Sequence, residues 1–149
     1  MSATLTRRAV LGAAAAAAPL AGAAAWSPFA TTVPDVPLLD QRRRPWRFRS
    51  EALAGRPVVA LDLIYAGCTS VCPLSTRVMA EARGLLGEAA TGGALRCLSL
   101  TLDPEADTPE RLAGYAAAAG LPPDAAGGEA WLFLPGAPQD VAAGLRGLR

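Results

Sequence analysis

The sequence predicts an α/β domain with a parallel sheet, preceded by an export segment. Three observations indicate this organisation. Apolar runs of strand length alternate with longer helical patterns, in the order strand, helix, strand, helix, strand. Two adjacent arginines precede a long run of small apolar residues at the N-terminus. The length, 149 residues, is enough for one domain.

The first 25 residues are typical of a secretory signal peptide. Arg7 and Arg8 precede the apolar run, which ends on small residues, and together they have the pattern of a twin-arginine export signal. An ordinary signal peptide and a retained N-terminal anchor through residues 9–26 are the alternatives. All three predict a periplasmic or other extracytoplasmic location, tethered to the membrane if the anchor is kept. Disulfides persist in such compartments.

The domain itself is expected over residues 38–149. Residues 26–37 contain three prolines and are expected to form an extended linker. Alternation of aromatic and arginine side chains then predicts a hairpin, with strands at 38–41 and 46–48 joined by a solvated basic turn at 42–44.

Three strands are predicted in the remainder of the chain. Residues 58–65 follow a short loop at 51–56 and are almost continuously apolar, which favours a strand buried on both faces at the centre of a parallel sheet. Asp62 interrupts this run and is expected at the rim or with a partner. The other strands are expected at 95–102, where the side chains alternate between two faces, and at 131–134.

Helices are expected after each of these strands. The first starts at Pro73, because proline suits the first helical position, and ends at 91–93. The second has Thr108 as its N-cap and Pro109 as its first residue. The third spans 139–148. In the first helix an apolar stripe at helical spacing is formed by Leu74, Val78, Ala82 and Leu85.

The composition excludes several function classes. The net charge is +1, and it stays close to zero without the leader, which contains two of the 14 arginines. A nucleic-acid partner is therefore not expected, because it would need a clearly basic protein. The chain contains no histidine. Histidine-based acid–base catalysis and histidine-ligated metal sites within this chain are therefore excluded.

Cys68 and Cys72, at the end of the first predicted strand, are the candidate site. Cys72 lies at a helix entrance, where the dipole is expected to lower its pKa, and Cys68 lies one turn earlier, so the two sulfurs can converge. The pair can bind a soft metal such as copper, form a redox-active disulfide, or form a plain structural disulfide. Zinc is less favoured because it takes four ligands. Cys97 is expected to be a buried small residue, with a third ligand or resolving thiol as the alternative.

Three stretches of the chain resemble the SCO/SenC family of copper-handling, thioredoxin-fold proteins. The first carries Cys-x3-Cys-Pro at 63–73, the second carries Asp-Pro-Glu-x-Asp-Thr-Pro within 98–109, and the third is 131–136. The resemblance covers residues 38–136 and implies a thioredoxin-like (redoxin) fold. It also implies a metallochaperone that delivers copper to the CuA site of cytochrome c oxidase. The implied partners are the oxidase subunit carrying CuA and other periplasmic copper chaperones.

The resemblance leaves a second function open, a thiol–disulfide reductase that acts on partner cysteines outside the cytoplasm, with Cys68 and Cys72 as its catalytic pair. In the family, two cysteines and a downstream histidine bind copper. Cys68 and Cys72 match the cysteines, and the histidine has no counterpart. Two thiolates are expected to hold Cu(I) in linear coordination and Cu(II) poorly.

The resemblance also implies a sheet in the order third, second, first strand, followed by a last strand pair for which this chain has no counterpart. The first strand is then expected to be an open apolar edge. The sequence is accordingly interpreted as a truncated or mis-called gene product, or as a chain that a partner completes.

Overall fold

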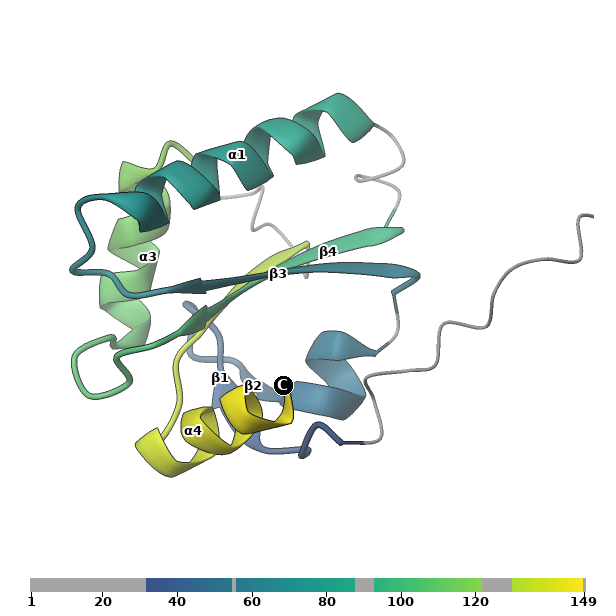
Figure 1. Cartoon of the computed structure of the whole chain (residues 1–149), viewed down its shortest axis with the longest axis vertical. Coiled ribbons are helices and arrows are strands. Elements are labelled where there is room, and N and C mark those ends of the chain that lie inside the picture. The colour runs from purple at the N-terminus through teal and green to yellow at the C-terminus, as the bar shows by residue number, and fades with distance from the viewer. Residues whose placement is uncertain (1–31, 55, 88–92, 122–129, 149) are drawn as a thin grey trace, which may run out of the picture.

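The structure, a computed structural model, describes residues 32–54, 56–87, 93–121 and 130–148 (Figure 1). It confirms the predicted α/β class. Three parallel strands form the central sheet, in the order β3-β4-β5: β3 (Val58–Ile64), β4 (Leu95–Thr101) and β5 (Trp131–Leu134). Counted from β5 to β3, this is the expected order of third, second and first predicted strand.

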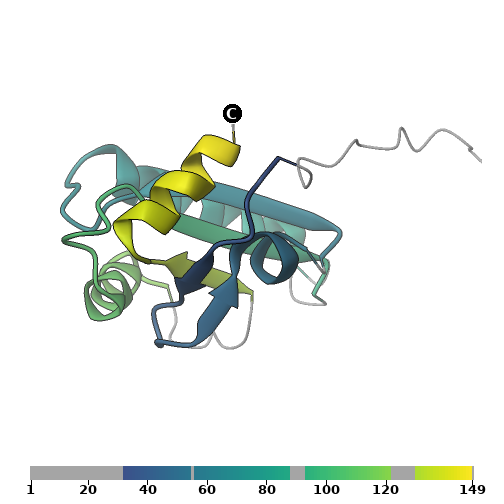
Figure 2. The ribbon, with the colours of Figure 1, turned by 90° about the horizontal axis from the view of Figure 1, so that it is seen from below.

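Helices cover both faces of the sheet. Two helices, α1 (Val71–Leu86) and α3 (Pro109–Ala118), lie on one face (Figure 1). Figure 2 shows α4 (Pro138–Gly147) on the opposite face, together with an antiparallel hairpin of β1 (Pro37–Leu39) and β2 (Pro45–Arg47).

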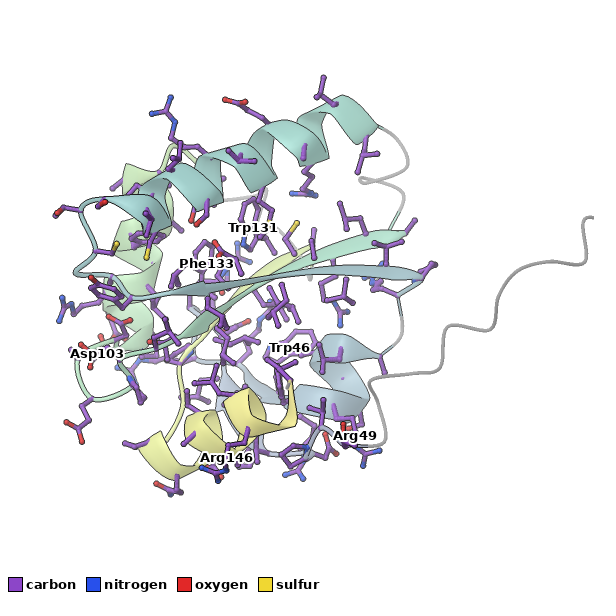
Figure 3. The ribbon with its side chains drawn as sticks, viewed as in Figure 1. Trp46, Arg49, Asp103, Trp131, Phe133 and Arg146 are labelled. Atoms are coloured by element: carbon purple, nitrogen blue, oxygen red, sulfur yellow. The ribbon has the colours of Figure 1, made fainter. Side chains whose placement is uncertain are left out.

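Each face of the sheet has its own apolar core, because successive side chains of a strand point to opposite faces. In β4, Leu95 and Cys97 pack toward α1 and α3, whereas Leu98 and Leu100 pack toward α4 and the hairpin. This is the alternation that the sequence predicted. Trp131 and Phe133 of β5 stack on the α1 and α3 side (Figure 3), with ring centroids 5.8 Å apart.

The two outer edges of the sheet differ. The backbone of β5 is bonded by the hairpin, since Gln41 receives the Phe133 N–H at 3.0 Å and donates to the Trp131 carbonyl at 3.2 Å. In β3, Val58 and Ile64 bond to the chain on the β4 side. The alternate residues of β3 therefore direct their N–H and C=O groups toward an edge that no described strand covers.

This edge position corrects the prediction that the strand is buried on both faces. Val58 and Leu63 are exposed, and only Ile64 of β3 is fully buried. Asp62 has a partner, as expected, because the Ser75 hydroxyl of α1 donates to its carboxylate at 3.0 Å.

The apolar stripe of α1 is also not where the pattern placed it. The side chains of α1 that pack inward are Cys72, Thr76, Met79 and Ala80. On a helical projection the stripe lies on the flank that also carries Ser75, the residue bonded to β3. This surface, the apolar flank of α1, is exposed and consists of Val71, Leu74, Val78, Ala82, Leu85 and Leu86.

Several element boundaries differ from the prediction. Helix α1 starts at Val71, two residues before Pro73, and ends at Leu86, with Gly87 at φ 52° as its C-cap. The segment expected as a loop after the hairpin forms a π-helical turn, η2 (Phe48–Leu53). The buried side chain of Arg96, in β4, holds this turn by donating to its carbonyl oxygens, including that of Ala52 at 2.9 Å.

The N-terminal segment enters the description only near its end. The predicted leader, residues 1–25, lies outside the described residues. Within the predicted linker, Val33 is buried in the core on the α4 side, and Asp35 accepts hydrogen bonds from Arg49 and Ser50. No helix among the described residues has the length and apolar composition needed to cross a membrane.

Candidate functional site

The structure brings Cys68 and Cys72 together where β3 meets α1. The chain leaves β3 at Ile64 and makes a turn closed by the Cys68 N–H, which donates to the Tyr65 carbonyl at 3.0 Å. The two cysteines are 7% and 5% exposed, and both are free thiols. The Cys72 N–H donates to Cys68 Sγ at 3.4 Å, so the sulfur of Cys68 lies at the N-terminus of α1.

Cys68 acts as the polar cap that the helix otherwise lacks. Ser70 is the N-cap by position, but its side chain makes no capping hydrogen bond. The pKa of Cys68 is lowered from 9.0 to about 7. The Cys72 thiol, which donates to the Cys68 sulfur, is the first cause, followed by the backbone N–H groups of Cys72 and Ser70 and by the Tyr65 hydroxyl.

The pKa of Cys72 shifts in the opposite direction. Burial raises it first, and the hydrogen bond to Cys68 raises it further because that bond stabilises the protonated form of Cys72. The prediction placed the lowered pKa on Cys72 and is wrong on this point. Since α1 begins at Val71, its free N–H groups face the preceding residues, and Cys68 receives them.

Asp107 fixes the loop before the cysteines and was not singled out from the sequence. Both of its carboxylate oxygens accept from the Ala66 N–H at 3.1 Å, and one accepts from the Thr101 hydroxyl at 2.7 Å. The residue is buried. It precedes Thr108, whose hydroxyl caps α3 by accepting from the Arg111 N–H at 3.3 Å, as predicted. The signal for Asp107 was present in the Asp-Pro-Glu-x-Asp-Thr-Pro stretch, whose first Asp, Asp103, is exposed.

Cys97 lies on β4, and its side chain contributes to the same core as the two cysteines of the pair. It is fully buried in β4, as predicted, and burial raises the pKa of its thiol. Within the described residues, no group of three or more His, Cys, Asp or Glu side chains could hold a metal ion together. Cys68 and Cys72 therefore offer two sulfur donors. Two soft donors fit Cu(I), which accepts thiolate ligands, better than they fit Cu(II) or zinc.

Comparison with known proteins gives one family. The family described as SCO1/SenC matches residues 30–145 of the chain. No curated protein matches.

Solved structures show the same family. ScoI from Bradyrhizobium japonicum, solved with copper bound, is 25% identical over 76% of this chain and 64% of that chain, with a TM-score of 0.63. BsSco, a member of the Sco family of cytochrome c oxidase assembly proteins that has a disulfide switch, is 29% identical over 69% of this chain and 54% of that chain, with a TM-score of 0.54.

Yeast Sco1, also solved with copper bound, is similar in fold. It is 21% identical over 76% of this chain and 65% of that chain, with a TM-score of 0.59. The chain thus spans less than two thirds of the length of each of these three proteins. The family match covers most of the chain, and the three-stranded parallel sheet agrees with it. The chain belongs to the SCO1/SenC family and has a thioredoxin-like α/β fold.

Proposed function

We propose that this protein handles copper during the assembly of cytochrome c oxidase, with Cu(I) carried as cargo between Cys68 and Cys72. The observation that carries this proposal is the pair itself, two free thiols joined through a hydrogen bond at the end of β3, in a chain of the SCO1/SenC family. Copper is bound in the structures of two related proteins, and a third is described as a member of an oxidase assembly family.

The thiol chemistry supports copper as cargo. Cys68 is about half ionised at neutral pH because its pKa is about 7. A thiolate binds Cu(I) directly, and Cu(I) binding to the neighbouring Cys72 would displace its proton. A thiolate of the oxidase subunit that carries CuA, or of another copper chaperone, can then replace one of the two sulfurs. Linear two-coordinate Cu(I) allows such exchange, since a third sulfur can approach before the first leaves.

The predicted leader gives the setting for this proposal. An exported protein, cleaved or tethered through residues 9–26, would meet the oxidase on the outer side of the membrane. Disulfides form readily outside the cytoplasm, so Cys68 and Cys72 can exchange copper or thiols there only if the pair is kept reduced.

Copper binding is tested by competition. The reduced protein is titrated against a coloured Cu(I) chelator, and binding of one Cu(I) per chain is expected. Cys68→Ala and Cys72→Ala should each abolish competition, while Cys97→Ala should retain it because Cys97, which is fully buried, is not one of the proposed ligands. Failure of the reduced wild-type protein to compete would reject the proposal, and loss of binding in folded Cys97→Ala would reject this choice of ligands.

A second function is favoured by the opposite pKa shifts of the two thiols. Cys68 has the properties of an attacking thiolate, and the protonated Cys72 those of a resolving thiol. The protein would then act as a thiol–disulfide reductase on partner cysteines. The copper-free reduced protein should reduce a mixed disulfide on an oxidase-derived peptide. A Cys68–Cys72 reduction potential below about −300 mV would argue for a structural disulfide instead.

A further inference from the structure

A groove beside Cys68 has no role in copper binding as proposed above. It lies between α1 and α3, on the face of the sheet that these two helices cover (Figure 1). Its volume is about 680 Å³, and Cys68 forms part of its wall. Cys68 therefore borders a space large enough for several residues of another chain.

Two arginines stand on opposite walls of this groove. Arg77 projects from α1 and Arg111 from α3, and both are exposed. Arg111 is held in place by the Ala106 carbonyl, to which its Nη1 donates at 3.1 Å. Its other terminal nitrogen lies 4.0 Å from the position that a Cβ on Gly67 would occupy, next to the cysteine loop.

None of the described residues that line the groove is a carboxylate that could balance these charges, and the Cys68 thiolate is the one negative group that can form there. Among the described residues, neither Arg77 nor Arg111 forms an ion pair. Guanidinium groups prefer planar carboxylates as partners, and a concave site concentrates their field. The unmatched charge thus selects an anionic ligand.

The rest of the lining suits a polypeptide. Pro73 and Tyr115 supply apolar surface. Gly114 has no side chain and Ala118 has only a methyl group, so a backbone can approach α3 closely there. Cys68 is only 7% exposed, so an incoming sulfur has to be guided to it. A segment lying along the groove would bring a cysteine of its own to this point.

We propose that the groove between α1 and α3 docks an acidic polypeptide segment of the partner protein, with Arg77 and Arg111 holding its carboxylates and placing its cysteine against Cys68. This inference rests on the proposed function, because it concerns the partner with which Cys68 exchanges copper or a disulfide. It specifies the chemistry of that partner, namely aspartate or glutamate residues next to a cysteine.

The test uses two peptides of equal length whose single cysteine carries a nitrothiobenzoate group. One peptide has aspartates and the other has asparagines around the cysteine. The Cys68 thiolate attacks the peptide sulfur, a disulfide forms between Cys68 and the peptide, and nitrothiobenzoate leaves as a coloured thiolate. The ratio of the two rate constants, acidic over neutral, isolates the contribution of the carboxylates because the leaving group is the same.

The expected ratio for the reduced full-length protein at low salt is about tenfold. It should fall close to one in Arg77→Gln/Arg111→Gln and at high salt, and Arg77→Lys/Arg111→Lys should restore most of it. Arg146→Gln is the matched control, since Arg146 lies on α4 on the opposite face of the sheet (Figure 3). The single variant Arg77→Gln checks that a fall in the ratio does not come from misfolding, because the described Arg77 side chain has no hydrogen bond whose loss would disturb the fold.

A ratio near one in the wild-type protein would overturn the proposal. So would an equal fall in Arg146→Gln, since net charge and not the groove would then be responsible. Failure of this inference can be distinguished from failure of the proposed function, because Cu(I) competition and the rate with the asparagine peptide are measured on the same variants. Loss of the ratio with both of these retained supports the groove. Absence of Cu(I) binding by the wild-type protein would reject copper handling and would leave the rate ratio unaffected.

Discussion

The two cysteines of the site differ because one lies before the helix and the other lies inside it. Cys68 precedes Val71, the first residue of α1, and receives N–H groups that the helix leaves free. Cys72 is in the first turn and packs inward, where burial opposes its ionisation. At neutral pH this assigns the thiolate to Cys68 and the proton to Cys72.

The first prediction concerns the reactivity of Cys68. Its rate of alkylation by iodoacetamide should rise through a midpoint near pH 7 and level off above it, because the thiolate is the reactive form and the pKa of Cys68 is lowered to about 7. Cys72→Ala removes the first cause of the lowering, so the midpoint should move up toward 9.0. The measurement is mass spectrometry of the alkylated residue across pH.

Tyr65→Phe provides the comparison, since the Tyr65 hydroxyl is the least of the causes that lower the pKa of Cys68. It should raise the midpoint by less than Cys72→Ala does. An unchanged midpoint in Cys72→Ala would show that the thiol of Cys72 does not stabilise the Cys68 thiolate.

The sequence was sufficient to locate this pair and to predict that the N–H groups of a helix start act on one of its cysteines. The pKa of Cys68 is lowered first by the Cys72 thiol and then by backbone N–H groups at the helix start. The prediction assigned the effect of the helix start to Cys72 because it placed that start at Pro73. Proline is favourable at the first helical position and is also tolerated later in the first turn, where no N–H is needed. Because α1 starts two residues earlier than predicted, its N–H groups reach Cys68, where they add to the effect of the Cys72 thiol.

At the scale of secondary-structure elements, Asp107 connects three of them. It lies in the loop between β4 and α3, and it binds the Ala66 N–H after β3 and the Thr101 hydroxyl at the end of β4. The position of the cysteine loop thus depends on one buried carboxylate. Charged hydrogen-bond acceptors of this kind are costly to replace, because the donors are left unmatched.

The second prediction follows from this connection. Asp107→Asn should lower the free energy of unfolding by about 1–3 kcal/mol, because the amide has one acceptor oxygen where the carboxylate accepts hydrogen bonds at two. It should also broaden the pH profile of Cys68 alkylation, since the loop before Cys68 is less well held. Urea denaturation measures the first effect.

Asp103→Asn is the matched control for Asp107. Asp103 lies in the same loop, is exposed, and accepts from the Ala106 N–H at 3.3 Å. A change below about 0.5 kcal/mol is expected there. Equal losses in the two variants would mean that the loop as a whole, and not Asp107, positions the cysteines.

Local sequence patterns predicted most elements correctly, and tertiary context explains the failures. The Thr108 cap and the Pro109 start of α3 are local features, so they could be predicted from the sequence. Turn η2 was not, because it depends on Arg96, a distant residue of β4. The stripe of α1 has helical periodicity, but periodicity does not say which flank meets the sheet, and the inward side is formed by Cys72, Thr76 and their neighbours.

At the scale of the whole molecule, the two edges of the sheet differ, because the hairpin covers the β5 edge and the β3 edge is exposed and apolar. The apolar flank of α1 continues to the exposed edge of β3, where Val58, Leu63 and Tyr65 are also exposed. Exposed apolar surface next to an unpaired strand edge promotes association. The sequence predicted the strand order and this open edge, but it did not predict that α1 adds its own flank to it.

The third prediction is that this surface drives self-association. Sedimentation of the chain should show a mass that rises with concentration, and Val78→Lys/Leu85→Lys should reduce it. Because Val78 is 57% and Leu85 is 90% exposed, the free energy of unfolding should change by less than about 0.5 kcal/mol. Leu112→Ala, a fully buried change in α3, should instead cost about 2–5 kcal/mol. A strongly destabilised lysine variant would show that the flank is packed in the folded protein.

The complete burial of Cys97 has a consequence for how this protein recovers from unfolding. In the folded chain the third thiol is inaccessible, so oxidation can join only Cys68 and Cys72. An unfolded chain exposes all three thiols, and two of the three possible pairings then join Cys97 in a disulfide, whereas the folded chain buries Cys97 as a free thiol. Refolding under oxidising conditions should therefore give a lower yield of native protein than refolding in a reducing buffer. If the chain is exported before it folds, every molecule is exposed to the same mispairing.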